Sequence, residues 1–338
     1  MLRTAVVALV AALLVAPTLP ADAAPGPVVP AREPEVTGFA LGSLPASVVR
    51  REAHALRTVA VSGVGLAADG RGVGRPTADV RSVARAARRA GLRTELVLSN
   101  YSNRLGDFDA VRAHRLLSSP AAIDRVARRM SLLVARGPWG GVNVDLELVR
   151  RGDAAGLVAL CAALQRAMPA ARTVSIDVSA AGTPRAYRDR GYALTRLGRT
   201  VDRVVVMAYD QHGPTWSGPG PVGALPWQRR AMAAALTRVP AERLDLGVAG
   251  YGYTWPKAGS GRTGRSLSPR AARRLAREAG VRPTWHQRTG EWSVRLPDGT
   301  RIWWSDARSY ALRVRLAEQL GVRGVAVWRL GSADPLPR

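Results

Sequence analysis

The chain has 338 residues, of which 47% are hydrophobic, and its formal net charge is +25 at pH 7. That length allows one large domain or two ordinary ones, and the single cysteine, Cys161, excludes a disulfide within the chain. The basic residues are almost all arginines spread over helical patterns, with no dense tract and no recognisable nucleic-acid module, so nucleic acid is not an expected partner. Cys161 lies in an apolar helical pattern, which predicts a buried thiol.

The N-terminal segment has the pattern of a secretory signal peptide over residues 1–23. Arg3 precedes an apolar run at 5–15, and a small-x-small site stands at 21–23. The apolar run is shorter than the roughly 20 residues of a membrane span, so no transmembrane segment is expected in the mature chain. The Pro-rich residues 24–34 predict a short linker.

From residue 35 onward, strand-like and helix-like segments alternate. One helical pattern is especially clear, with Ser119 as N-cap, Pro120 at the first helical position and Gly137 as a stop. Eight apolar, β-branched-rich runs predict strands at 35–43, 57–65, 94–102, 141–149, 173–180, 202–210, 243–253 and 321–330. Such an alternation predicts an α/β fold with a parallel sheet, and at this size an eightfold (β/α)8 TIM barrel, with an open doubly wound sheet as the alternative.

One interval interrupts the alternation. Some 65 residues separate "GYGYTW" from "GVRGVAVW", and Asp298-Gly299 stands between two alternating runs, which is a hairpin signal. We therefore expect a small β-rich insertion at about 256–305, between the seventh strand and the last helix. That helix is predicted from about Asp306 to Leu320.

Two carboxylates stand in the apolar run "GGVNVDLELV", at Asp145 and Glu147. Charged residues are rarely buried unless they are paired or functional. The period of two places both on one face of a strand. They could form a structural ion pair, for example with Arg150, or an acid/base site.

Polar and aromatic residues stand at the predicted carboxyl ends of several strands, where barrels of this kind carry their active sites. They are Asn100, Asn143, Asp145, Glu147, Tyr209, Asp210, His212, Tyr251 and Trp328. Aromatic rings pack on the apolar faces of sugars. A carboxylic acid in a partly apolar site can protonate a glycosidic oxygen. The pattern therefore favours a carbohydrate cleft.

Several spaced motifs resemble glycoside hydrolase family 18. "GGVNVDLE" resembles its D-G-x-D-x-D-x-E signature, "MAYD" its M-x-Y-D, and "VWRL" its strand-eight tryptophan. "SGPGPVGALPW", "GYGYTW" and "WWSDARSY" are similar to phrases of the bacterial cell-wall and spore-cortex N-acetylglucosaminidase branch. The resemblance implies a catalytic barrel over 35–338.

The resemblance also implies roles. Glu147 matches the general acid/base, Asp145 the carboxylate that orients the substrate's acetamido group, and Tyr209 the residue that bonds the acetamido oxygen. Substrate contacts are expected from Asp210, with Trp328 as the floor of the −1 subsite. Asn143, Asn100, Tyr251 and His212 complete the expected substrate-binding set.

The sequence departs from the family signature at two positions, where Gly140 and Asn143 stand in place of aspartates. Other interpretations also apply to the site residues. Trp328 and Tyr251 could be core packing, His212 could in principle be a metal ligand, and Asn100 could be a structural amide rather than a substrate contact.

The sequence pattern together with this resemblance implies a secreted glycoside hydrolase, with association with the cell wall as a further expectation. The resemblance implies that it cleaves β-1,4 linkages of N-acetylglucosamine-containing polysaccharide by a substrate-assisted, retaining mechanism. Peptidoglycan is favoured over chitin. No metal and no organic cofactor are expected, and a monomer is expected. The alternative is a weak or inactive sugar-binding protein on the same fold, a reading that the presence of Glu147, Asp145 and Tyr209 disfavours.

Overall fold

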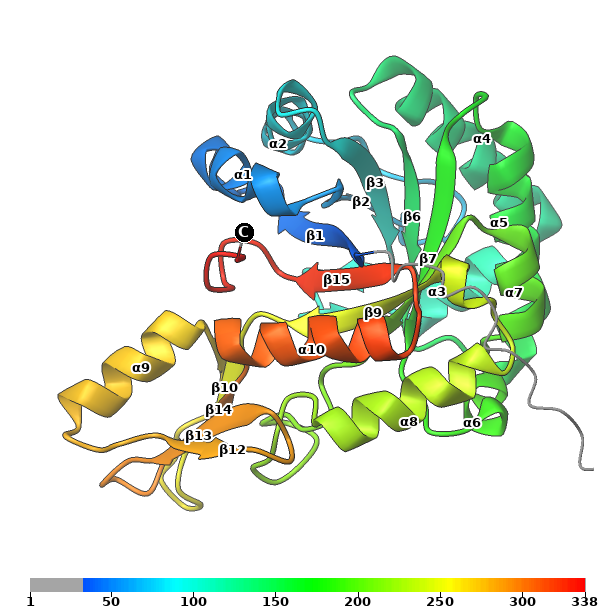
Figure 1. Ribbon diagram of the computed structural model, residues 1–338. Helices are drawn as coiled ribbons and strands as arrows, with labels where there is room; N and C mark the ends of the chain where they lie inside the picture. The colour runs from blue at the N-terminus through cyan, green and yellow to red at the C-terminus, as the bar shows by residue number, and fades with distance from the viewer. Residues whose placement is uncertain (1–32, 338) are drawn as a thin grey trace, which may run out of the picture. The chain divides into compact units, whose positions relative to one another are not determined.

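The computed structural model describes residues 33–337, so the predicted signal peptide and nearly all of the predicted linker lie outside the described residues. Eight parallel strands close into a barrel (Figure 1). In barrel order they are β1 (Glu35–Leu41), β15 (Gly324–Trp328), β9 (Leu244–Ala249), β8 (Arg203–Met207), β7 (Thr173–Ser179), β6 (Gly141–Asp145), β3 (Arg93–Ser99) and β2 (Thr58–Gly65). All eight predicted strands are present, and the predicted TIM barrel is confirmed.

Helices surround this barrel (Figure 1). They are α1 (Ala46–Glu52), α2 (Ala78–Arg89), α3 (Ala110–Leu117), α4 (Pro120–Arg136), α5 (Ala154–Ala167), α6 (Pro184–Asp189), α7 (Leu194–Thr200), α8 (Leu225–Leu236) and α10 (Ala307–Gln319). The predicted signals of α4 are confirmed, because the Ser119 side chain accepts a hydrogen bond from the Ala122 N–H at 3.3 Å and the helix ends before Gly137. Within residues 33–337, none of the helices has the length and apolar character that crossing a membrane requires.

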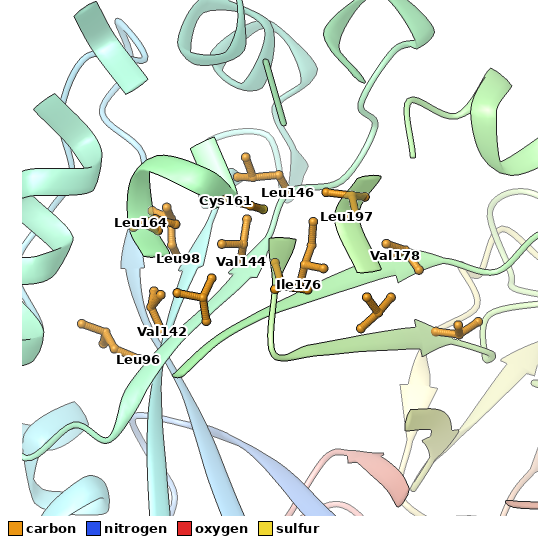
Figure 2. Packing of buried hydrophobic residues seen from close by; sticks show 14 of the residues in the cluster. Leu96, Leu98, Val142, Val144, Leu146, Cys161, Leu164, Ile176, Val178 and Leu197 are labelled. Atoms are coloured by element: carbon orange, nitrogen blue, oxygen red, sulfur yellow. The ribbon is translucent and has the colours of Figure 1, made fainter. Parts of the chain in front are cut away.

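The barrel strands have apolar side chains on both faces. Val142, Val144 and Leu146 point outward and pack against Cys161 and Leu164 of α5 (Figure 2). A smaller cluster fills the interior of the barrel and consists of Phe39, Ala60, Val97, Val205 and Ala326. Since side chains alternate along a strand, the outward positions of β6 leave Asn143 and Asp145 directed into the barrel.

The insertion is a five-stranded antiparallel sheet with a helix packed on it. Its strands are β10 (Gly252–Trp255), β11 (Ser266–Leu267), β12 (Thr284–His286), β13 (Glu291–Arg295) and β14 (Arg301–Trp304), in the order β11-β10-β14-β13-β12, and its helix is α9 (Pro269–Glu278). Asp298-Gly299 forms the predicted turn between β13 and β14, with Gly299 at φ +82°. Asp306 caps α10, as predicted. The sheet begins at Gly252, earlier than expected, because β10 follows β9 almost directly.

Candidate functional site

The predicted carboxylate pair lies at the carboxyl end of β6. The strand ends at Asp145, which is shorter than predicted, and Glu147 follows it just outside the ladder. Leu146 still packs outward with Val144 (Figure 2), so Asp145 and Glu147 lie on the opposite, inner side. Leu148 then adopts φ +55°, which turns the chain away from the strand direction.

Asn100 holds the backbone of Glu147 in place. Its Nδ2 donates to the Glu147 carbonyl at 2.9 Å, and its Oδ1 accepts from the Glu147 N–H at 2.9 Å. Nδ2 also donates to the Asp109 carbonyl at 3.1 Å, and the residue is fully buried. The expected substrate contact at Asn100 is therefore corrected. The amide serves the protein backbone and leaves nothing for a sugar to contact, as in the alternative interpretation.

Burial changes the acid strength of both carboxyls. Desolvation raises the pKa of Asp145 to about 6, against a smaller lowering from a hydrogen bond with the Ser99 side chain. Burial also raises the pKa of Glu147 well above its ordinary value, helped by the nearby carboxylates of Asp145, Asp210 and Asp177. A carboxyl with a raised pKa can remain protonated and deliver its proton to a leaving group.

The alternative of a structural ion pair is not supported. Within the part of the chain that the structure describes, the groups acting on the Glu147 pKa are other carboxylates, not an arginine. Arg150 instead lines the neighbouring cavity. A raised pKa at an open site is a feature of acid/base chemistry, whereas an ion pair would lower it.

Tyrosines from two strands surround Asp210, which follows β8 at φ +58°. The Tyr251 hydroxyl donates to Asp210 Oδ1, and the Tyr253 hydroxyl donates to the same oxygen at 2.8 Å. Tyr209 and Tyr251 pack edge to face with ring centroids 6.3 Å apart. The structure thus brings Tyr209, Asp210 and Tyr251 together, and it adds Tyr253, which sequence reasoning missed although it stands in the same "GYGYTW" phrase.

The two remaining aromatic predictions fall in different surroundings. Trp328 ends β15 and packs on Phe39 of the barrel interior, with ring centroids 5.8 Å apart, and it also packs against the cluster that contains Tyr251. His212 lies in the loop after β8, where its Nδ1 is 3.2 Å from Ser217 Oγ. Trp328 therefore lies between the core and the site, whereas His212 lies within its own loop.

A cavity of about 750 Å³ opens beside Glu147. Its walls come from the segments after β6, β7 and β8. Among the lining residues are Glu147, Tyr209, Asp210, Trp216, Trp227, Tyr192, Arg150, Arg151 and Arg190. Indole and phenol rings together with carboxylates form a surface suited to sugar rings and their hydroxyls.

The two departures from the family signature have different places in the structure. Gly140 precedes β6, seven residues or about 23 Å of extended chain from Glu147. A Cβ there would lie 3.1 Å from the Thr94 carbonyl oxygen. Asn143, in contrast, is fully buried beneath Asp145. Only the second departure therefore bears on the site.

Polar residues continue from Asn143 into the barrel interior, and sequence reasoning missed Ser175, Asp177, Glu95 and Arg203. Asn143 Nδ2 donates to Asp177 Oδ1 at 2.9 Å and to Ser175 Oγ at 3.0 Å, both on β7. Ser175 in turn donates to Glu95 at 2.9 Å, and Glu95 pairs with Arg203. Asn143, Ser175 and Asp177 each stand between apolar residues of a strand, which is the signal that singled out Asp145, whereas Glu95 and Arg203 follow polar residues.

Comparison with known proteins identifies the family of the chain. Residues 106–333 match the family described as "Glycosyl hydrolases family 18". An uncharacterized glycosylase of Bacillus subtilis, YvbX, is 26% identical over 254 residues, which are 73% of each chain. The Bacillus cereus spore cortex-lytic enzyme SleL superposes with a TM-score of 0.81 at 19% identity, covering 90% of this chain and 72% of that one. A Chromobacterium violaceum chitinase superposes with a TM-score of 0.78 at 25% identity, covering 89% and 95%. The chain belongs to glycosyl hydrolase family 18 and is a glycoside hydrolase.

Proposed function

We propose that the protein hydrolyses β-1,4 linkages of an N-acetylglucosamine-containing polysaccharide, with Glu147 as general acid/base. The observation that carries the proposal is a carboxyl with a strongly raised pKa at the mouth of an open cavity, with Asp145 beside it and Tyr209 and Asp210 in the cavity wall. Family membership supports the same chemistry.

The proposed mechanism is substrate-assisted and retaining. Glu147 donates its proton to the glycosidic oxygen as the bond from that oxygen to the anomeric carbon breaks. The oxygen of the 2-acetamido group attacks the anomeric carbon from the opposite face and forms an oxazolinium ion. Asp145 accepts a hydrogen bond from the acetamido N–H and stabilises the positive charge, while Tyr209 bonds the acetamido oxygen. Glu147 then deprotonates a water molecule, which attacks the anomeric carbon and opens the oxazolinium ring.

The remaining predicted residues bind substrate in this proposal. Trp328 forms the floor beneath the −1 sugar, and Asp210, held by Tyr251, bonds its hydroxyls. Asn143 acts from beneath Asp145 rather than on the sugar, because it is fully buried. His212 stays a predicted sugar contact from the loop after β8.

Peptidoglycan is the proposed polymer, ahead of chitin. Arg150, Arg151 and Arg190 line the cavity next to Glu147. Arg151 lies 3.6 Å from Asp189, which balances its charge. Arg150 and Arg190 are the arginines that make this cavity wall cationic. Peptidoglycan carries carboxylates on its lactyl and peptide groups, whereas chitin is uncharged. The cortex-lytic activity in the name of SleL supports the same polymer, and it supports action outside the cell.

The test is hydrolysis of purified peptidoglycan and of chitin oligosaccharides by the wild type and Glu147→Gln, with products identified by mass. Loss of the general acid should lower the rate about 10²-fold to 10⁴-fold. Glu318→Gln, at an exposed position on α10, is the matched control and should retain wild-type rates. Muropeptides with reducing N-acetylglucosamine ends support the proposal. Release of chitobiose alone would assign a chitinase, and binding without turnover by both proteins would assign a lectin.

A further inference from the structure

A buried acceptor without a donor marks the interior beneath Asp145. Asn143 is fully buried, and both hydrogen bonds of its Nδ2 go to β7, to Ser175 and Asp177. Among residues 33–337, no donor reaches Asn143 Oδ1. A buried carbonyl oxygen without a partner costs about 1–3 kcal/mol, so such groups nearly always have one.

The group that faces Asn143 can become a donor. Asp177 is only 3% exposed, and its Oδ1 accepts from Asn143 Nδ2 at 2.9 Å. If Asp177 is protonated, its hydroxyl can donate to Asn143 Oδ1, and the two side chains form a reciprocal acid–amide pair. An ionised Asp177 only accepts, and it leaves the Asn143 oxygen without a donor.

The charges around Asp177 favour its protonated form. Arg203 is the nearby cation, from β8, but Glu95 and Asp245 both pair with it. From β6, Asp145 repels a second negative charge. Burial and this repulsion raise the pKa of Asp177 well above its ordinary value, and they outweigh the lowering by Asn143 and Arg203. An ionised Asp177 would raise the pKa values of Glu147 and Tyr209, and a proton on Asp177 removes that effect.

We propose that Asp177 is a positioning residue that stays protonated in the working enzyme, paired with Asn143, so that Asp145 alone carries the negative charge at the centre of the site. The inference rests on the role proposed above for Asp145. A neutral Asp177 fixes Asn143 beneath Asp145 and spares Asp145 a second buried charge. It also explains the amide at position 143. An ionised aspartate at that position could not donate a hydrogen bond to Asp177, whereas the Asn143 side chain does.

Infrared difference spectroscopy tests the proton directly and needs no turnover. At pH 7, the spectrum of the wild type minus that of Asp177→Asn should contain the carbonyl band of a protonated carboxyl. The spectrum of the wild type minus that of Asp145→Asn should contain chiefly carboxylate bands. A carboxylate band in the first difference would overturn the proposal, whatever the substrate of the enzyme proves to be. Circular dichroism and thermal unfolding confirm that each variant is folded.

Rescue by the conservative variant gives a second readout. Asn offers one donor and one acceptor to Asn143, as a protonated Asp does, whereas Ala offers neither. Asp177→Ala should therefore lose about tenfold or more in turnover. Asp177→Asn should recover most of that loss, and the acid limb of its pH profile should lie where it lies in the wild type. An Asn variant as impaired as the Ala variant, with its acid limb displaced, would show that Asp177 works as a charge.

Discussion

At the scale of single residues, Asn100 holds the backbone that carries the Glu147 carboxyl. Its side-chain amide makes two hydrogen bonds of 2.9 Å to the Glu147 backbone, one with the carbonyl and one with the N–H. Asn100→Ala should lower kcat and cost about 1–3 kcal/mol of unfolding free energy, because buried backbone groups lose their partners. Turnover assays and denaturant unfolding measure the two effects. Asn103→Ala, in the exposed turn nearby, is the control. Equal kcat in both variants would contradict the positioning role.

The raised pKa of Asp145 also links stability to pH. Its folded pKa of about 6 exceeds the ordinary 3.8, so the unfolded chain releases this proton first. Stability therefore falls as pH rises from about 4 to 6, by up to about 3 kcal/mol for this group. Asp145→Asn should remove that loss and make the protein more stable at pH 7, with little effect at pH 4. Denaturant titrations at the two pH values measure this, and equal effects at both would contradict it.

Asp145 and Glu147 could be singled out from the sequence because two carboxylates interrupt an apolar strand. The same signal is present at Asp177, between Ile176 and Val178, but no companion charge on that strand drew attention to it. A structural amide was one of two interpretations of Asn100, but its partner could not be predicted, since the bond joins residues 47 positions apart. Strand periodicity gives the direction of a side chain and not its partner on another strand.

At the scale of elements, a buried ion pair joins the insertion to the barrel loop after β8. Glu291 of β13 accepts from the Val222 and Gly223 N–H groups at 2.7 and 2.8 Å, and Arg313 of α10 lies 3.3 Å from it. Arg313 also donates to the Gly223 carbonyl at 2.7 Å. This connection, the insertion tie, fixes the end of the loop that carries Trp216. Val222 and Gly223 belong to the phrase "SGPGPVGALPW", and Ser305 of "WWSDARSY" donates to Glu291 at 3.0 Å.

Removing only the cation of the insertion tie should lower the free energy of unfolding more than removing both charges. Arg313→Met leaves Glu291 buried without its cation and should cost about 3–5 kcal/mol of unfolding free energy. Adding Glu291→Gln should restore part of that loss, because the remaining amide can still accept from the loop. Denaturant unfolding of the two single variants and the double variant measures the coupling. Strictly additive losses would contradict it.

The elements themselves were largely predictable. All eight barrel strands are rich in apolar residues, and such runs bounded by turn residues are clear in sequence. The insertion was harder to delimit, because the apolar "GYGYTW" continues the seventh strand without a break in pattern. Only the pairing of Gly252 with Leu267 and Trp304 shows that the chain has left the barrel there.

At the scale of the whole molecule, the net charge of +25 should act on adsorption rather than on chemistry. The arginines of the exposed helical faces attract an anionic wall, and salt weakens such attraction. Raising the salt concentration should release the protein from isolated cell walls while turnover of uncharged chitin oligosaccharides changes little. Sedimentation with walls and oligosaccharide assays in the same buffers test this. A parallel fall in both would place the charge effect within the catalytic cleft.

The insertion tie has a consequence for anyone who recombines members of this family. Glu291 lies on the first strand of the hairpin and Arg313 on the last helix, yet the backbone groups that they bind belong to the loop after β8. A chimera that exchanges the insertion alone would separate a buried carboxylate from the backbone amides that solvate it. The loop, the hairpin and the last helix form one structural unit, and a chimera should exchange all three together.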